Sequence, residues 1–221
     1  MSMPIADKTT YLAPLVCEMR KVWPENRTIM IVCHGHSVPA GYFWTPHVDT
    51  FNSYPHLFHL RIKERFPFAV TNVIVTAIGG ANSISGSGRF KQDVLCHKPD
   101  LITIDYGLND RWTDISEVRK AWTDMVRAGT DSGARIILLT PTWDMSVVTP
   151  GDENGRLLRE RAALIRDIAG NECVGLADSY RAFERVVSSG VPLESLLSSG
   201  NHPNRKGHEL VVDELMSWFP F

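Results

Sequence analysis

The stretch Thr28-Ile-Met-Ile-Val-Cys33-His34-Gly35-His36-Ser37 decides the fold. It begins with a continuous apolar run, which is typical of a strand covered on both faces, and it ends in polar residues around a glycine. Three further runs share this character and a weaker fifth run follows them; they span 72–77, 101–105, 135–140 and 173–177. These runs predict a central parallel sheet of about five strands.

Amphipathic segments alternate with these runs. Apolar residues at helical spacing predict helices over 8–21, 114–128, 154–169 and 206–218, with Pro14 near the start of the first. Alternating strands and helices are the pattern of an α/β fold, here a three-layer α/β/α sandwich. Because the chain shows no internal repeat and no linker, we expect a single domain over residues 1–221.

Composition excludes several classes of function. A formal net charge of -2 over 221 residues lacks the basic excess of a nucleic-acid binder. No apolar run approaches the roughly 18 residues of a membrane span, so we expect no membrane partner. No secretory signal is visible, and the four scattered cysteines are expected to be buried free thiols in the cytoplasm. No cofactor motif is present, so no cofactor is expected, and the oligomeric state stays open.

Polar residues follow the predicted strands, at the edge of a parallel sheet where ligands bind. They include Ser37 after the first strand, Gly80 after the second and Asn109 after the third, and His202 lies near the end of the chain. A serine needs a base such as histidine to become a nucleophile, and an oxyanion needs fixed donors. We therefore expect acyl transfer with Ser37 and His202 as catalytic residues. The N–H groups of Ser37 and Gly80 and the amide of Asn109 would form the oxyanion hole.

In the order of these residues the chain resembles the SGNH hydrolase superfamily, the GDSL-type esterases. Gly35-His36-Ser37 resembles the Gly-Asp-Ser block of that family, and Gly80 its second-block glycine. Gly107-Leu108-Asn109-Asp110 matches its Gly-x-Asn-Asp block, and Ser199-Gly200-Asn201-His202-Pro203 resembles its Asp-x-x-His-Pro block. The resemblance implies a flavodoxin-like α/β/α fold. It also implies a serine hydrolase that cleaves a small acyl or carbohydrate ester, a small-molecule substrate, through an acyl-enzyme.

The chain departs from the family pattern at two positions. His36 stands where the family has Asp, and we expect it to be a hydrogen-bonding group behind the site. Ser199 stands where the family has the Asp that orients the catalytic histidine. Another carboxylate, from Asp110, Asp144 or Asp178, would then have to orient His202, or a Ser37–His202 dyad would work with a backbone carbonyl, or the activity would be low. A non-catalytic ligand-binding relative and an acyltransferase using the same serine are the alternative functions.

Other residues near the blocks have both a functional and a structural interpretation. Ser37 taken alone would be a helix cap, and Asn109 a turn residue. Alternation of His34 and His36 would suit a metal, but the residue pattern favours no metal site. The remaining candidates are Arg89 and Arg111, for an anionic substrate group or structural ion pairs, and Phe43, Trp44 and Trp143, for an aromatic wall or the core.

Overall fold

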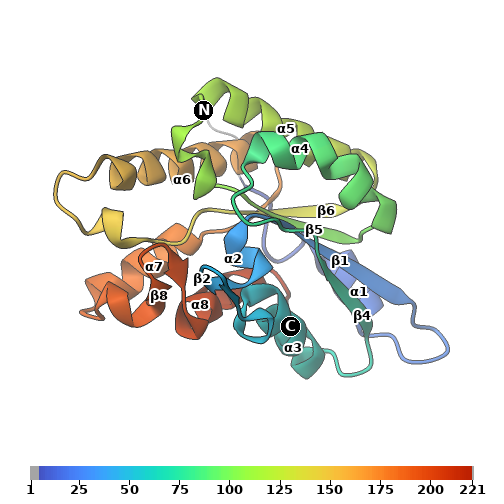
Figure 1. Ribbon diagram of the computed structural model, residues 1–221. Helices are drawn as coiled ribbons and strands as arrows, with labels where there is room; N and C mark the ends of the chain where they lie inside the picture. The colour runs from blue at the N-terminus through green and yellow to red at the C-terminus, as the bar shows by residue number, and fades with distance from the viewer. Residues whose placement is uncertain (1–4, 221) are drawn as a thin grey trace.

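The computed structural model describes residues 5–220, and its main feature is a five-stranded parallel sheet in the order β4-β1-β5-β6-β7 (Figure 1). The runs predicted from the sequence form all five strands with small shifts at their ends. Their bounds are β1 Thr28–Gly35, β4 Val70–Val75, β5 Leu101–Asp105, β6 Arg135–Leu139 and β7 Gly175–Ala177. The predicted central sheet is therefore confirmed.

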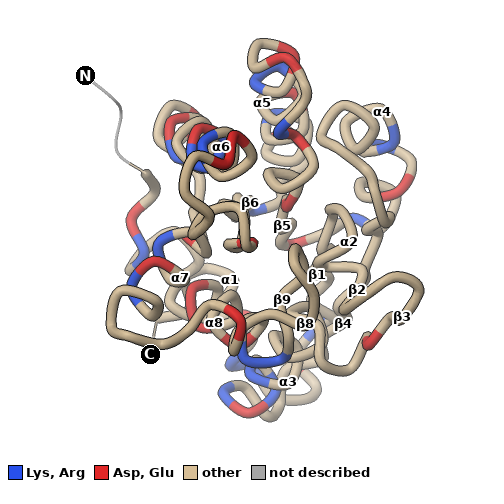
Figure 2. The backbone as a smooth tube through the Cα atoms, turned by 60° about the vertical axis from the view of Figure 1, so that its left-hand side comes forward, with Lys and Arg blue, Asp and Glu red and all other residues tan. Residues whose placement is uncertain are grey.

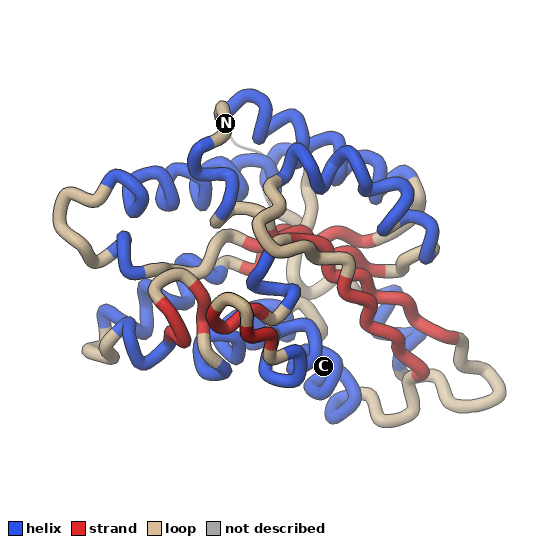
Figure 3. Tube along the Cα trace, viewed as in Figure 1, coloured by secondary structure: helices blue, strands red, loops and turns tan. Residues whose placement is uncertain are grey.

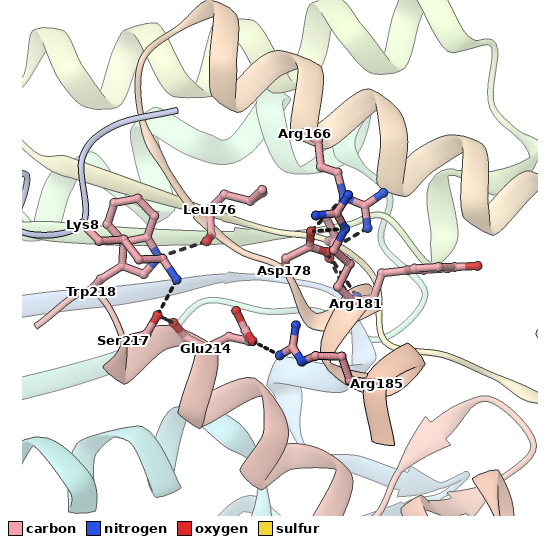
Figure 4. A network of polar contacts seen from close by, with 11 residues as sticks. Lys8, Arg166, Leu176, Asp178, Arg181, Arg185, Glu214, Ser217 and Trp218 are labelled. Carbon is pink, nitrogen blue, oxygen red and sulfur yellow. Dashed lines mark hydrogen bonds and ion pairs between the residues drawn. The ribbon is translucent and has the colours of Figure 1, made fainter. Parts of the chain in front are cut away.

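Helices cover both faces of this sheet, which confirms the α/β/α sandwich (Figure 1). One face carries α4 (Ser83–Asp93), α5 (Ile115–Asp131) and α6 (Glu153–Asn171), and the other carries α1 (Ala13–Met19), α3 (Tyr54–Arg65), α7 (Ser179–Ser188) and α8 (Arg205–Met216). The helix pattern of the sequence predicted α1, α5, α6 and α8, with Pro14 in the first turn of α1. At the end of the chain, the indole N–H of Trp218 donates to the carbonyl of Leu176, 2.9 Å away, and so ties the segment after α8 to β7 (Figure 4).

Two expectations about burial are corrected by the structure. Strand β4 is an edge strand and is only partly covered, with Val70 48% and Val75 40% exposed. Of the four free cysteines only Cys33, within β1, is buried. The other three lie on a helix or in turns at the surface, where no sheet face covers them.

Two small antiparallel ribbons lie outside the main sheet, next to the one-turn helix α2 (Ser37–Ala40) (Figure 3). One pairs β2 (Tyr42–Trp44) with β3 (His47–Val48), and the other pairs β8 (Leu197–Ser199) with β9 (His202–Pro203). The hydroxyl of Ser198 donates to the carbonyl of Phe43 at 2.6 Å and joins the ribbons. This contact brings the end of the chain beside the segment that follows β1.

Charged residues lie mainly on the outer helices. Acidic and basic residues are interspersed along α5 and α6 (Figure 2), while α2 and β9 contain neither kind. Within residues 5–220, no helix combines the length and the apolar character that crossing a membrane requires.

Candidate active site

Ser37 lies where β1 ends and α2 begins. Gly35 permits a close approach there, because a Cβ atom at this position would lie 2.5 Å from the carbonyl oxygen of Asp105. The N–H of His36 donates to that same carbonyl at 3.2 Å. As the first residue of α2, Ser37 has an N–H without an intrahelical partner, and the residue is buried, with 9% exposed.

His202, in β9, directly contacts Ser37, at the start of α2. Its Nε2 lies 2.8 Å from Ser37 Oγ, and its Nδ1 lies 3.3 Å from Ser199 Oγ. Because a hydroxyl can donate or accept, these contacts are compatible with either neutral tautomer, and a base at Nε2 requires the one in which Nδ1–H donates to Ser199 and Nε2 accepts from Ser37. Burial, and to a lesser degree the neighbouring His36, lower the pKa of His202 below its usual value. The imidazole is therefore neutral near pH 7, as a base must be.

The glycine turn after β4 is hydrogen-bonded to Asn109 and to the end of β1, where Ile78 N–H donates to the carbonyl of Gly35 at 3.0 Å. Gly80 is exposed with φ of +78°, and the space at its Cβ position is open. The Asn109 amide donates to the carbonyl of Ala81 at 2.9 Å, which uses one of its two N–H groups. The loops that carry Gly80 and Asn109, two of the expected oxyanion donors, are thus joined by a hydrogen bond.

Tyr42 connects the glycine turn to the histidine and was not identified from the sequence. Its ring packs on Gly79, where a Cβ would lie 3.0 Å from the ring, and its centroid is 6.5 Å from that of His202. The aromatic run 42–44 directly after the first block was the available signal.

The three carboxylates suggested as orienting groups are all held elsewhere. Asp110 accepts from Ser83 N–H and from Trp122 Nε1–H, both at 2.8 Å. The pKa of Asp110 is raised, because the effect of burial outweighs these two hydrogen bonds, which lower it. Asp144 pairs with Arg111 at 2.6 Å.

The third carboxylate, Asp178, forms ion pairs with Arg166, at 2.8 Å, and with Arg181, at 3.7 Å (Figure 4). Its pKa is lowered because the hydrogen bonds and charge of Arg166 outweigh the effect of burial. At the far nitrogen of His202 the structure instead places the hydroxyl of Ser199.

The remaining candidates have structural partners. Arg89 donates to the Thr76 carbonyl at 2.6 Å and to the Tyr106 hydroxyl at 2.9 Å, and it pairs with Asp93 at 2.9 Å. Phe43 stacks on His208 with centroids 5.4 Å apart, and Trp143 packs on Tyr180 at 5.5 Å. Phe43 and Trp143 are 7% and 8% exposed and pack in the core, whereas Trp44 is half exposed and stacks on His47.

His34 and His36 do not converge on a common point. His34 contacts Thr76 Oγ1 at 2.8 Å and the Gly86 carbonyl at 3.1 Å, and burial lowers its pKa to about 4. His36 Nε2 lies 3.3 Å from Asp105 Oδ1. Over residues 5–220 there is no cluster of three or more His, Cys, Asp or Glu side chains placed to hold a metal ion.

Comparison with known proteins places this geometry in context. The model of the GDSL-like lipase/acylhydrolase family matches residues 33–210. A solved acetylxylan esterase from Geobacillus stearothermophilus superposes with a TM-score of 0.77 at 19% identity, over 87% of this chain and 94% of the other. An alpha/beta hydrolase enzyme from the metagenome of Lake Arreo, Spain, superposes at 0.75 with 20% identity, over 91% and 97%. The comparison with curated proteins finds no match.

Alanine variants of that esterase at one serine, one aspartate and one histidine are described as catalytic mutants. The aspartate precedes the histidine by three residues in its chain.

Proposed function

The chain belongs to the family of GDSL-like lipases and acylhydrolases, and from this premise we propose that it hydrolyses a carboxylic ester with Ser37 as nucleophile and His202 as base. Ester hydrolysis is the activity of the family; the residues and the substrate are our proposal. The observation that carries it is the 2.8 Å contact between Ser37 Oγ and His202 Nε2. A hydroxyl at this distance from a neutral imidazole is the arrangement that nucleophilic catalysis requires.

In the first half of the reaction, Ser37 Oγ attacks the ester carbonyl carbon while His202 Nε2 takes its proton. The carbonyl electron pair moves to oxygen, and the N–H groups of Ser37 and Gly80 and the free N–H of Asn109 stabilise that charge. The intermediate then expels the alcohol, which takes the proton from His202, and leaves the acyl group on Ser37. Water repeats the sequence with His202 as base, releases the acid and restores the serine.

Ser199 orients His202 in this mechanism. When its oxygen accepts a hydrogen bond from Nδ1–H, Nε2 is left free to accept a proton. A hydroxyl carries no charge, so it stabilises the imidazolium less than a carboxylate would. We expect a working enzyme with a slower chemical step than one with aspartate at this position.

As substrate we propose an uncharged ester of a small acyl group, such as an acetylated sugar. Arg111 is neutralised by Asp144, and Arg89 is occupied by Thr76, Tyr106 and Asp93. Neither therefore offers an open positive charge to an anionic substrate. The similarity to an acetylxylan esterase supports an acetylated carbohydrate as the first compound to test.

The direct test compares hydrolysis of p-nitrophenyl acetate and acetylated xylo-oligosaccharides by the wild type and by Ser37→Ala and His202→Ala. We expect each variant to lose roughly 10³-fold or more in kcat, because the two groups act as one unit. Ser195→Ala, at an exposed serine in the same C-terminal region, serves as the control and should match the wild type. Full activity of Ser37→Ala would overturn the proposal.

Because serine stands at position 199 where the family has aspartate, two alternative functions are tested as well. A non-catalytic relative would bind the ester in calorimetry without releasing product. An acyltransferase would pass the acyl group to an added alcohol faster than to water. A burst of p-nitrophenol followed by steady release of acetate, undiminished by added alcohol, excludes both.

A further inference from the structure

Side-chain contacts lead away from Ser37 in two directions, and the proposed mechanism uses the contacts on only one side. On one side lie His202 and then Ser199. On the other side His36 Nδ1 lies 3.5 Å from Ser37 Oγ, and His36 Nε2 lies 3.3 Å from Asp105 Oδ1. The carboxylate of Asp105 thus contacts His36, which directly precedes the nucleophile in the chain.

The hydrogen bonds of His36 define its tautomer. The backbone N–H of Val38 donates to Nδ1 at 3.2 Å, so Nδ1 carries a lone pair. The ring hydrogen then belongs to Nε2 and is donated to Asp105. His36 and Asp105 are 1% and 4% exposed, so water does not compete for either contact.

This arrangement makes His36 the N-cap of α2, which carries Ser37. Helix α2 has four residues, and a single turn depends on its cap because it has few hydrogen bonds of its own. Through the contact of Nδ1 with Val38 N–H, the imidazole is placed to hold this turn.

Resting on the proposed function, we propose that His36 is a positioning residue of the reaction. Its imidazole, fixed by Asp105, holds the turn that carries Ser37 and sets the Ser37 hydroxyl against His202. Asp105 is the second member of this unit, because it determines which nitrogen of His36 is free to accept.

Four variants separate this role from general packing. His36→Asn retains an acceptor for Val38 N–H, and His36→Ala removes it. His36→Asp retains an acceptor but places a second buried carboxylate beside Asp105. Adding Asp105→Asn to His36→Asp removes the like charge and supplies an amide that donates to the new carboxylate.

We expect kcat for p-nitrophenyl acetate to fall about 10- to 100-fold in His36→Ala, with KM within about twofold, and to stay within about fivefold in His36→Asn. His36→Asp should be active at acid pH, where one of the two neighbouring carboxylates is protonated, and lose activity as pH rises and both become charged. The double variant should recover activity at neutral pH. His202 from β9 and Asp110 after β5 also lie near position 36, and Tyr54 of α3 and Cys33 of β1 face Asp105; all four are unchanged in the series.

Asp114→Ala provides the stability control, because it removes an exposed cap of α5, where Asp114 accepts from the N–H groups of Ser116 and Glu117. It should lower the melting temperature and leave kcat unchanged. Wild-type kcat in a folded His36→Ala, or a flat pH profile for His36→Asp, would overturn the inference. So would residual activity of His202→Ala that disappears with Asp105→Asn, since His36 would then be a base.

The Ser37→Ala variant separates the two proposals. If it is fully active, the proposed function fails and the His36 series says nothing about positioning of a nucleophile. If it is inactive while His36→Ala matches the wild type, only this inference fails.

Discussion

Replacing Ser199 by aspartate should make the enzyme faster. Ser199 Oγ lies 3.3 Å from His202 Nδ1 in a half-buried position, and it orients the ring without charge. A carboxylate about 5 Å from the imidazolium charge, at an effective dielectric constant of about 20, would stabilise it by about 3 kcal/mol. Desolvation of the carboxylate cancels part of this gain, which leaves a kcat increase of roughly 10- to 100-fold.

The assay is p-nitrophenyl acetate hydrolysis by Ser199→Asp across pH 5 to 9. The acid limb of the profile should move to higher pH, because a nearby negative charge raises the pKa of His202. Ser199→Ala should lose roughly 2- to 10-fold, the value of one neutral hydrogen bond. Ser195→Asp adds the same charge at an exposed serine and should leave both kcat and the limb unchanged. A Ser199→Asp enzyme with unchanged rate and unchanged acid limb would refute this account of His202.

Three further predictions concern the oxyanion site, the approach of β1 to β5, and buried histidines. Asn109→Ala should lower kcat by roughly 10²- to 10³-fold with little change in KM in steady-state kinetics, and an unchanged kcat would remove Asn109 from the oxyanion hole. Gly35→Ala should lower the free energy of unfolding by about 2 kcal/mol or more in urea titrations, because its Cβ would lie 2.5 Å from the Asp105 carbonyl oxygen, whereas Gly88→Ala, with open space at its Cβ, should not destabilise. Burial lowers the pKa of His34 to about 4 and that of His208 to about 3, so their stabilising effect is complete above about pH 6.5 and is lost as pH falls toward these values. Each histidine should lower the free energy of unfolding by about 2 kcal/mol at pH 5 relative to pH 7.5. Equal urea midpoints at the two pH values would contradict this prediction.

The parts of the fold that follow from local pattern were predictable from the sequence. The continuous apolar runs of β1, β5 and β6 and the apolar stripes of α5 and α6 depend on neighbouring residues only. Helix α4 was not predicted, because its sequence Ser-Ile-Ser-Gly-Ser-Gly has weak helix propensity. Gly86 is needed there because a Cβ would lie 2.4 Å from the Tyr106 ring.

The candidate site divides in the same way. The order of blocks predicted that Ser37 and His202 belong together, and the structure places them in contact. The partner at the far side of His202 could not be predicted. Asp144 and Asp178 are unavailable because Arg111 and Arg166 hold them, and such pairings depend on the packed structure.

The contact of His36 with Asp105 depends on packing as well, because it joins the ends of β1 and β5, which are distant in sequence and neighbours in the sheet. The glycine at position 35 was the only local sign of that approach.

The central claim is that Ser37 carries the acyl group, and trapping the acyl-enzyme tests it most directly. Wild-type protein is mixed with p-nitrophenyl acetate, quenched in acid within the burst, digested and analysed by mass spectrometry. The account predicts one acetyl group on the peptide that contains Ser37, absent from Ser37→Ala and accumulating more slowly in His202→Ala. An acetyl group found only on another residue, or turnover without any acylated peptide, would contradict it.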